Sequence, residues 1–226
     1  MYNIDEMRSQ FLAICDMLEE ANIKEFLNDC CGCTMRAFKK RYYEQHLDEK
    51  VFITNGCSRA VFILPELDYV FKVQYDDFEY GNYCEAEARV FELAQTECVE
   101  EYFAWTCFVG NFGQAAVYAM EKVEASEERI SDDSYQYHVE QWKEDCGYTD
   151  EDEMESQYCG DYDDHDGMIE FAVAHNGGRM LRAVERVIDE LGINDLHFGN
   201  WGYRGDTLVL IDYGGYGTKL FKNDNE

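Results

Sequence analysis

Three polar side chains near the carboxyl-terminal end of the sequence have the types and the spacing of a site for a hard cation. Asp195 and Asn200 stand five residues apart in the segment DLHFGN, and Asp212 follows the apolar run LVLI. Mg²⁺ binds proteins through one or two carboxylate or amide oxygens and shares its other positions with phosphates. Asn200 and Asp212 are therefore candidate metal ligands, and Asp195 is a candidate for the group that orients or deprotonates an attacking hydroxyl.

A lysine and a glutamate earlier in the chain could complete a phosphate site. Lys72 lies in the apolar run YVFKV, where strand alternation predicts that its ammonium group projects from one face of a sheet. The next helical segment carries Glu85 and Glu87, and either could pair with Lys72 and hold it over a phosphate. Glu87 is favoured because it shares a helix face with Phe91. The alternative is a surface lysine beside a solvated acidic helix face.

The periodicity of apolar residues predicts the elements that must position these side chains. Helical spacing covers residues 4–46, which we expect to pack as a cap on another part of the molecule. The other predicted elements are strands over 51–56, 58–64 and 69–73, a helix over 82–95 with Asn82 as its N-cap, strands over 102–110 and 115–120, a helix over 178–192 that ends at Gly192, and a strand over 207–211.

Residues 126–166 are strongly acidic and poor in apolar side chains. This composition predicts a solvated insertion, with a helical part around YQYHVEQW, rather than a piece of the core. Its charge would attract a polycation, or it would act only as a solubilising loop.

The chain of 226 residues contains 19 Lys and Arg against 48 Asp and Glu, a formal net charge of −29. This field repels nucleic-acid backbones and anionic membranes and favours cationic partners. No apolar run approaches the roughly 18 residues of a membrane span. The absence of a signal-peptide pattern predicts a reducing compartment, the cytoplasm, for the ten Cys. The cluster CCGC at 30–33 has no second Cys or His pair at zinc-finger spacing, so buried free thiols are predicted in preference to a metal–thiolate site.

Several segments together resemble the nucleotide-site motifs of the protein-kinase-like superfamily, nearest to its aminoglycoside and choline phosphotransferase branch. The segment DLHFGN is similar to the Asp-Leu-His-x-Gly-Asn block of that branch, and LVLIDYGG to its metal-binding segment. NGCSRAVFIL resembles a shortened glycine-rich loop between two strands, YVFKV the strand of the ATP-contacting lysine, CEAEARVFELA the helix of its partner glutamate, and VYAMEKVEA the strand that leads into the hinge. The resemblance covers about residues 50–215 apart from the acidic segment.

The resemblance implies ATP and Mg²⁺ as cofactors and gives each candidate residue a role. Lys72 would contact the α- and β-phosphates with Glu87 as its helix partner, and Asp195 would be the catalytic aspartate. Asn200 and Asp212 would hold Mg²⁺.

The same resemblance implies backbone contacts with the nucleotide. The N–H groups of Gly56, Cys57 and Ser58 would lie over the phosphates. Backbone groups of Glu121 and Val123, just beyond Met120, would contact adenine.

The implied fold is α+β and bilobal. It comprises an N-terminal helical extension (1–48), a kinase-like N-lobe with an antiparallel sheet (49–120), and a hinge, the acidic insertion and a reduced helical C-lobe (121–226). Ile193 and Asn194 replace the His-Arg pair of regulated protein kinases, which argues against control by a phosphorylated activation loop. The glycine-rich loop retains only Gly56, and the peptide-binding platform of protein kinases is not expected.

Two functions fit these patterns. The first is an ATP- and Mg²⁺-dependent phosphotransferase that transfers the γ-phosphate to a hydroxyl of a protein or small-molecule acceptor through Asp195. The second is an acidic, catalytically weak kinase-like protein that binds a basic partner surface, as an inhibitor or nucleic-acid mimic, because the net charge of −29 favours such a partner. Nucleotide bound only as a structural ligand is a third state that the same residues allow.

Overall fold

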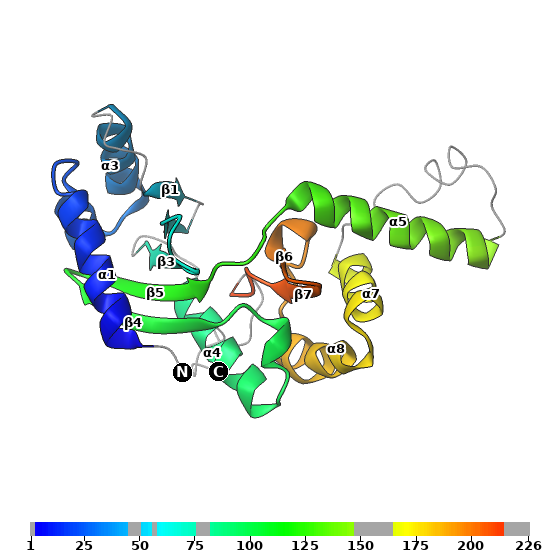
Figure 1. The fold of residues 1–226 in the computed structure, drawn as a ribbon. Coiled ribbons are helices and arrows are strands. Elements are labelled where there is room, and N and C mark those ends of the chain that lie inside the picture. Colours follow the sequence, from blue (N-terminus) through cyan, green and yellow to red (C-terminus); the bar gives the residue numbers. More distant parts are fainter. Residues whose placement is uncertain (1–2, 45–50, 56–57, 76–81, 147–164, 215–226) are drawn as a thin grey trace, which may run out of the picture. The chain divides into compact units, whose positions relative to one another are not determined.

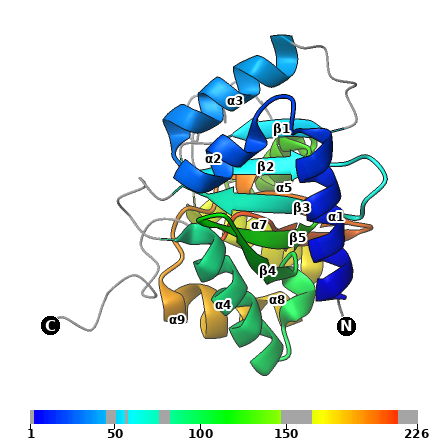
Figure 2. The same ribbon diagram turned by 90° about the vertical axis from the view of Figure 1, so that its left-hand side faces the viewer.

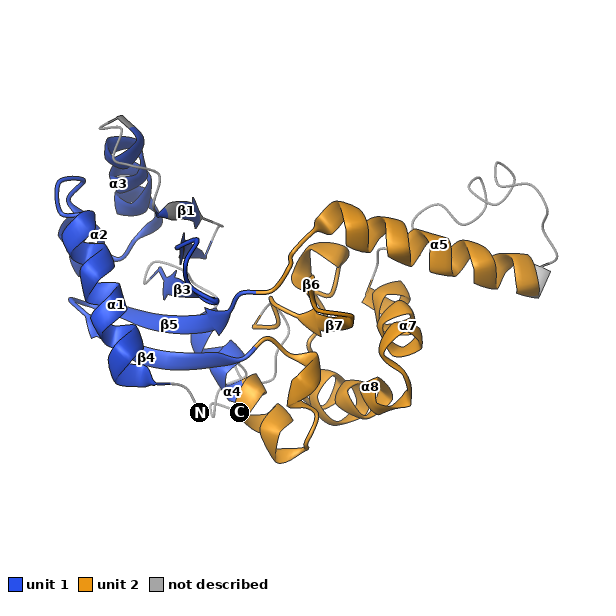
Figure 3. Ribbon diagram, in the orientation of Figure 1, with its two compact units in different colours: residues 1–89, 105–122 blue, residues 90–104, 123–226 orange. Residues whose placement is uncertain are grey.

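The computed structural model describes residues 3–44, 51–55, 58–75, 82–146 and 165–214 (Figure 1). The chain divides into two compact units (Figure 3). Unit 1 comprises residues 1–89 and 105–122, and unit 2 comprises residues 90–104 and 123–226. The N-terminal helices therefore share a unit with the sheet, and residues 90–104 belong with the C-terminal part of the chain.

Unit 1 contains an antiparallel sheet of five strands in the order β1-β2-β3-β5-β4. Side chains alternate across it: Phe71 and Val73 are fully buried in the hydrophobic core, whereas Lys72 between them points to the opposite face. The α+β class with an antiparallel sheet is confirmed. The strands are β1 (Phe52–Asn55), β2 (Arg59–Ile63), β3 (Tyr69–Gln74), β4 (Thr106–Phe112) and β5 (Ala115–Glu121).

Three helices cover the core face of this sheet (Figure 2). They are α1 (Ile4–Met17), α2 (Ile23–Asp29) and α3 (Gly32–Glu44). The side chain of Asn3 caps α1 by accepting the N–H of Glu6. The ring of Phe11 lies 5.1 Å from that of Phe71, and burial of such a side chain contributes about 1.5–3 kcal/mol.

Helix α4 (Tyr83–Thr96) follows β3, and its first turn is bonded to the sheet. Asn82 is its N-cap as predicted, because its Oδ1 accepts the N–H of Glu85 at 3.0 Å. Gln74 of β3 accepts the N–H of Tyr83 at 3.1 Å and donates to the carbonyl of Ser58 at 2.9 Å. The Gln74 amide therefore joins the start of α4, the end of β3 and the start of β2.

The described part of unit 2 is mainly helical and also contains a β-hairpin. The predicted helix over 178–192 is present as α8 (Gly178–Ala183), a π-helical turn η2 (Val184–Ile188) and α9 (Asp189–Leu191). It ends at Gly192, which has a left-handed conformation (φ +66°) as its C-cap position requires. The other elements are η1 (Glu100–Tyr102), α5 (Glu127–Cys146), α7 (His165–Asn176), η3 (Phe198–Asn200), β6 (Trp201–Arg204) and β7 (Thr207–Leu210).

The helical part expected around YQYHVEQW is present, but the expectation that the segment stays out of the core is wrong for some of residues 127–143. They belong to the long helix α5, and one stripe of that helix is buried: Ile130, Ser134 and His138 follow one another at four-residue intervals with 0%, 0% and 5% of their surface exposed. The stripe has no apolar pattern in the sequence because two of its members are polar. His138 Nε2 lies 3.1 Å from the carbonyl of Gly167 in α7. Residues 147–164 of the expected insertion lie outside the described residues.

Two smaller expectations also differ from the structure. The helical periodicity of residues 178–192 also predicts that Leu181 belongs to the apolar stripe of that helix, but Leu181 is 48% exposed. The thiols of the CCGC cluster are not all buried, because Cys33 is exposed and Cys31 is half-buried. Within the described residues, no helix has both the length and the apolar character needed to span a bilayer.

Candidate functional site

The first group of candidate residues lies in unit 1, on the sheet face that carries Lys72. The ammonium Nζ of Lys72 lies 3.0 Å from Oε2 and 3.1 Å from Oε1 of Glu87 in α4. Of the two glutamates that the sequence offered, the structure therefore pairs Glu87 with Lys72. Glu85 is instead half-exposed and paired with Arg89 at the i, i+4 position.

A third charged side chain joins this pair, and sequence reasoning missed it. Arg59 of β2 donates from Nη1 to Oε1 of Glu87 at 2.8 Å, and we call Arg59, Lys72 and Glu87 the lysine cluster. The side chain of Glu87 has no exposed surface, and those of Arg59 and Lys72 are each 8% exposed. The signal in the sequence is the same as for Lys72: a cation inside an apolar strand, here SRAVFIL.

The β-ladder explains why the cluster forms. Arg59 pairs with Gln74 and Val61 pairs with Lys72, so Arg59 and Lys72 lie on neighbouring strands. Because Gln74 holds the N–H of Tyr83, the first residue of α4, the second turn of this helix brings Glu87 to both cations. The neighbouring thiol of Cys84 has its pKa raised to about 11, chiefly by burial, an effect that Arg59 partly offsets.

The predicted phosphate loop lies only partly within the described residues. Gly56 and Cys57 are outside them. Ser58 is buried, and its carbonyl accepts hydrogen bonds from the N–H of Tyr75 and from the Gln74 amide, each at 2.9 Å. Ser58 is therefore fixed to the end of β3, next to Arg59.

The residues predicted to contact adenine lie at the end of β5 and beyond it. Met120 is 2% exposed. The N–H of Glu121 donates to the carbonyl of Trp105 at 2.9 Å. Val123 is the first residue of unit 2 after β5. Its Cγ2 packs against Gly202, where an added Cβ would lie only 2.5 Å from that carbon.

The second group lies in unit 2, in the loop 193–200 that joins α9 to β6. Ile193 and Leu196 are buried, with 3% and 1% of their surface exposed, and Ile193 donates its N–H to the carbonyl of Ile188. Between these anchors, Asp195 keeps 48% of its side chain exposed. The loop thus presents the carboxylate of Asp195 while its apolar residues hold it to the helix.

Asn200 links this loop to the strand that ends at Asp212. Its side-chain Nδ2 donates to the backbone carbonyl of Asp195. Its own carbonyl accepts the N–H groups of Ile211 at 2.9 Å and Asp212 at 3.4 Å. Asn200 therefore bonds to both Asp195 and Asp212. Its side chain is buried, and only 6% of the residue surface is exposed.

The hairpin β6–β7 explains how two residues twelve positions apart become neighbours. Trp201 pairs with Leu210 and Arg204 with Thr207, and Gly205 begins the two-residue turn with φ +60°. The side chain of Asn176 in α7 extends the support by donating to the carbonyl of Leu208 at 2.7 Å and accepting its N–H at 2.9 Å.

Beyond Asp212 the chain is anchored to the segment that follows η1. Tyr213 is fully buried, and its hydroxyl donates to the carbonyl of Ala104 at 2.5 Å. The N–H of Ala104 donates to the carbonyl of Leu210 at 2.7 Å. The half-buried Asp212 is thus held on one side by Asn200 and on the other by Tyr213.

His197 and Gly199 complete the loop, and neither stood among the predicted site residues. His197 Nδ1 accepts the N–H of Gly199 at 3.1 Å, which assigns the proton of the neutral ring to Nε2. Nε2 lies 3.9 Å from Oδ1 of Asp195. A side chain at position 199 would place its Cβ 2.9 Å from the His197 ring, so this close approach favours glycine.

No protein-family model matches the chain, and no curated protein is significantly similar to it. What the fold and the two groups of residues define is an α+β protein with a buried lysine–glutamate pair in one unit and an oxygen-rich loop in the other.

Proposed function

We propose that the protein is an ATP- and Mg²⁺-dependent phosphotransferase with a kinase-like bilobal fold. The observation that carries the proposal is the lysine cluster: a buried lysine on the third strand is paired with a fully buried glutamate on the following helix. A buried charge is expensive unless it is paired. A function for the ammonium group explains why it is retained on an inner strand.

The donor set of unit 2 fits Mg²⁺. The Asn200 nitrogen is engaged by the Asp195 carbonyl, so its Oδ1 is the atom that the proposal assigns to the metal, together with a carboxylate oxygen of Asp212. Both are hard oxygen ligands of the kind that Mg²⁺ prefers. When bound, Mg²⁺ would neutralise charge on the phosphates.

The protein's own residues have distinct roles in this proposal. Lys72 binds the α- and β-phosphates, and Glu87 positions its ammonium group. Asp195 accepts the proton of the attacking hydroxyl at its exposed carboxylate, and His197 faces that carboxylate with Nε2. Backbone groups of Glu121 and Val123 are assigned to adenine, and the acceptor is a protein or small-molecule hydroxyl.

Transfer of labelled γ-phosphate, including autophosphorylation, tests the proposal. Asp212→Asn should lower the rate by roughly 10²–10³, the typical effect of removing one electrostatic contact to a transition state. Asp206→Asn is the matched control, because Asp206 is an exposed acid at the tip of the same hairpin. Equal labelling by wild type and Asp212→Asn would refute the proposed reaction.

A second candidate function is supported by the exposed acids of α5, and it is binding of a basic protein surface without phosphate transfer. The solvent side of this helix carries Glu127, Glu128, Asp132, Glu140 and Glu144. Thermal unfolding with Mg-ATP separates the two functions. A nucleotide-dependent rise in melting temperature supports the first, and no rise together with salt-sensitive binding of a basic partner supports the second.

A further inference from the structure

The turn between α2 and α3 in unit 1 brings three metal-ligating side chains together, far along the sequence from the candidate site. Cys30 reverses the chain there in a left-handed conformation (φ +44°, ψ +41°) that is rare for residues other than glycine. Its thiol is fully buried and donates to the carbonyl of Gln74 in β3 at 2.9 Å. The turn is therefore fastened to the sheet by Cys30, while Asp29, Cys31 and Cys33 lie towards solvent.

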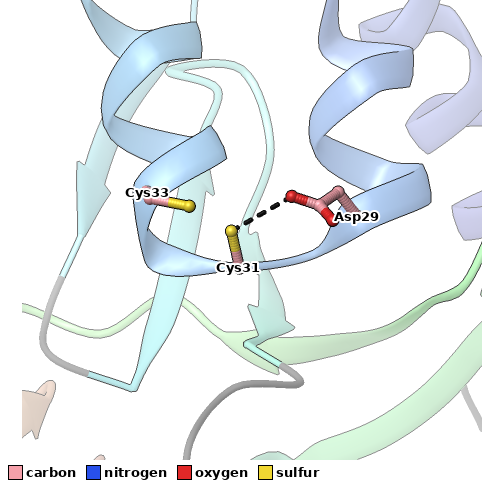
Figure 4. A group of neighbouring side chains, drawn as sticks. All are labelled: Asp29, Cys31 and Cys33. Atoms are coloured by element: carbon pink, nitrogen blue, oxygen red, sulfur yellow. Dashed lines mark hydrogen bonds between the residues drawn. The ribbon is translucent and has the colours of Figure 1, made fainter.

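The ligating atoms of these three residues converge (Figure 4). The Cys31 thiol donates to Oδ2 of Asp29 at 3.1 Å, and with the Cys33 sulfur all three atoms lie within 4.8 Å of one another. In a tetrahedral zinc site with bonds of about 2.0–2.3 Å, ligand atoms are about 3.3–3.8 Å apart. Side-chain rotations that move these atoms by about 1 Å would therefore be enough to bring all three within bonding distance of one ion.

The N-terminal end of α3 favours a negatively charged sulfur at Cys31. Cys31 immediately precedes the helix, and its sulfur accepts the N–H of Thr34 at 3.4 Å. The first-turn N–H groups and the positive end of a helix favour an anionic group such as a metal-bound thiolate.

We propose that Asp29, Cys31 and Cys33 bind one thiophilic divalent ion of the Zn²⁺ type. The ion binds two sulfur atoms and one carboxylate oxygen, and water or an external ligand takes the fourth position. Each cysteine releases its proton to solvent as its sulfur binds, so two thiolates and one carboxylate face the two positive charges of the ion. The site is independent of the proposed phosphotransfer, because its ligands differ from the oxygen set that suits Mg²⁺.

Cobalt provides a direct probe of this site. The full-length protein, reduced and freed of metal, is titrated with Co²⁺ alone and then with Zn²⁺ as a competitor. We expect one equivalent of Co²⁺ to give a thiolate-to-cobalt charge-transfer band and the strong visible bands of a tetrahedral ion, and Zn²⁺ to abolish both. Cys31→Ser and Cys33→Ser should each weaken binding by more than the roughly 10- to 100-fold that loss of an outer-shell partner causes.

Two control variants keep the result interpretable. Cys98→Ser removes another exposed thiol and should bind Co²⁺ as the wild type does. Asp29→Asn should keep the charge-transfer band and weaken affinity, because it leaves both sulfur atoms. The proposal is overturned if the Cys31→Ser/Cys33→Ser double variant, with an unchanged circular dichroism spectrum, retains the band and the affinity. It is also overturned if the reduced wild type gives no band.

Discussion

The ammonium group of Lys72 contacts both carboxylate oxygens of Glu87, at 3.0 and 3.1 Å. The contact joins the centre of an inner strand to the second turn of the helix that follows it. Arg59 binds the same carboxylate at 2.8 Å, so one fully buried anion holds two cations. The position of Lys72 therefore depends on Glu87.

Removal of the Glu87 charge should strongly destabilise the fold. Glu87→Gln leaves Arg59 and Lys72 buried without their common carboxylate, and breaking such a pair typically lowers the free energy of unfolding by about 3–5 kcal/mol. Urea unfolding measures the change. Glu85→Gln is the control, because its exposed pair with Arg89 should contribute less than about 1 kcal/mol. Similar losses for the two variants would contradict a structural role specific to Glu87.

The Asp195 side chain should affect the reaction and leave the loop intact. It is half-exposed, and the backbone carbonyl of Asp195, not its carboxylate, accepts the Asn200 amide. Asp195→Asn should therefore lower phosphate transfer by roughly 10²–10⁴ while the Mg-ATP-dependent rise in melting temperature persists. Labelled transfer and thermal unfolding of the same preparation test this pair of outcomes. Loss of the nucleotide-dependent rise would show that the carboxylate acts in binding.

The hydroxyl of Tyr213 should stabilise the segment that carries Asp212. Tyr213→Phe leaves the buried carbonyl of Ala104 without this donor, which typically lowers the free energy of unfolding by about 1–3 kcal/mol. Tyr43→Phe is a matched control, since Tyr43 is 49% exposed and its hydroxyl bond to Ile53 is long, 3.4 Å. Denaturant unfolding of both variants gives the comparison. A change at Tyr213 no larger than that at Tyr43 would contradict the prediction.

The buried thiol of Cys84 should make the fold sensitive to alkali. Its pKa is raised from 9.0 to about 11, so the unfolded chain loses this proton at a lower pH than the folded protein does. The stability linked to Cys84 is present in full below the unfolded value and falls as pH rises through the folded one. Cys84→Ala should therefore show a shallower fall in unfolding free energy between about pH 8 and about pH 11 than the wild type. Cys98→Ala, at an exposed thiol, should keep the wild-type slope.

The elements that carry the candidate site were readable from the sequence because each has a strong local signal. Alternation in YVFKV placed Lys72 on the face opposite Phe71 and Val73, and Asn82 and Gly192 marked the ends of their helices. The choice of Glu87 over Glu85 followed from the helical repeat, and it agrees with the observed ion pair. These features depend on neighbours within a few residues.

What the sequence did not reveal depends on contacts between distant segments. The buried stripe of α5 contains Ser134 and His138, which local composition identifies as polar and solvated. The exposure of Cys33 results from the left-handed turn at Cys30, a conformation that the sequence CCGC does not predict. The part played by Arg59 became visible only when the ladder placed it beside Lys72.

The interval of twelve residues between Asn200 and Asp212 is a by-product of hairpin length. The observed arrangement needs only that the Asn200 carbonyl accept the N–H groups of Ile211 and Asp212 next to the Trp201–Leu210 pair of the hairpin. Extra residues at the tip, around Gly205 and Asp206, would lengthen the interval without shifting that ladder. A search for distant relatives should therefore let this spacing vary, and the tip is a permissive place for inserting a reporter sequence.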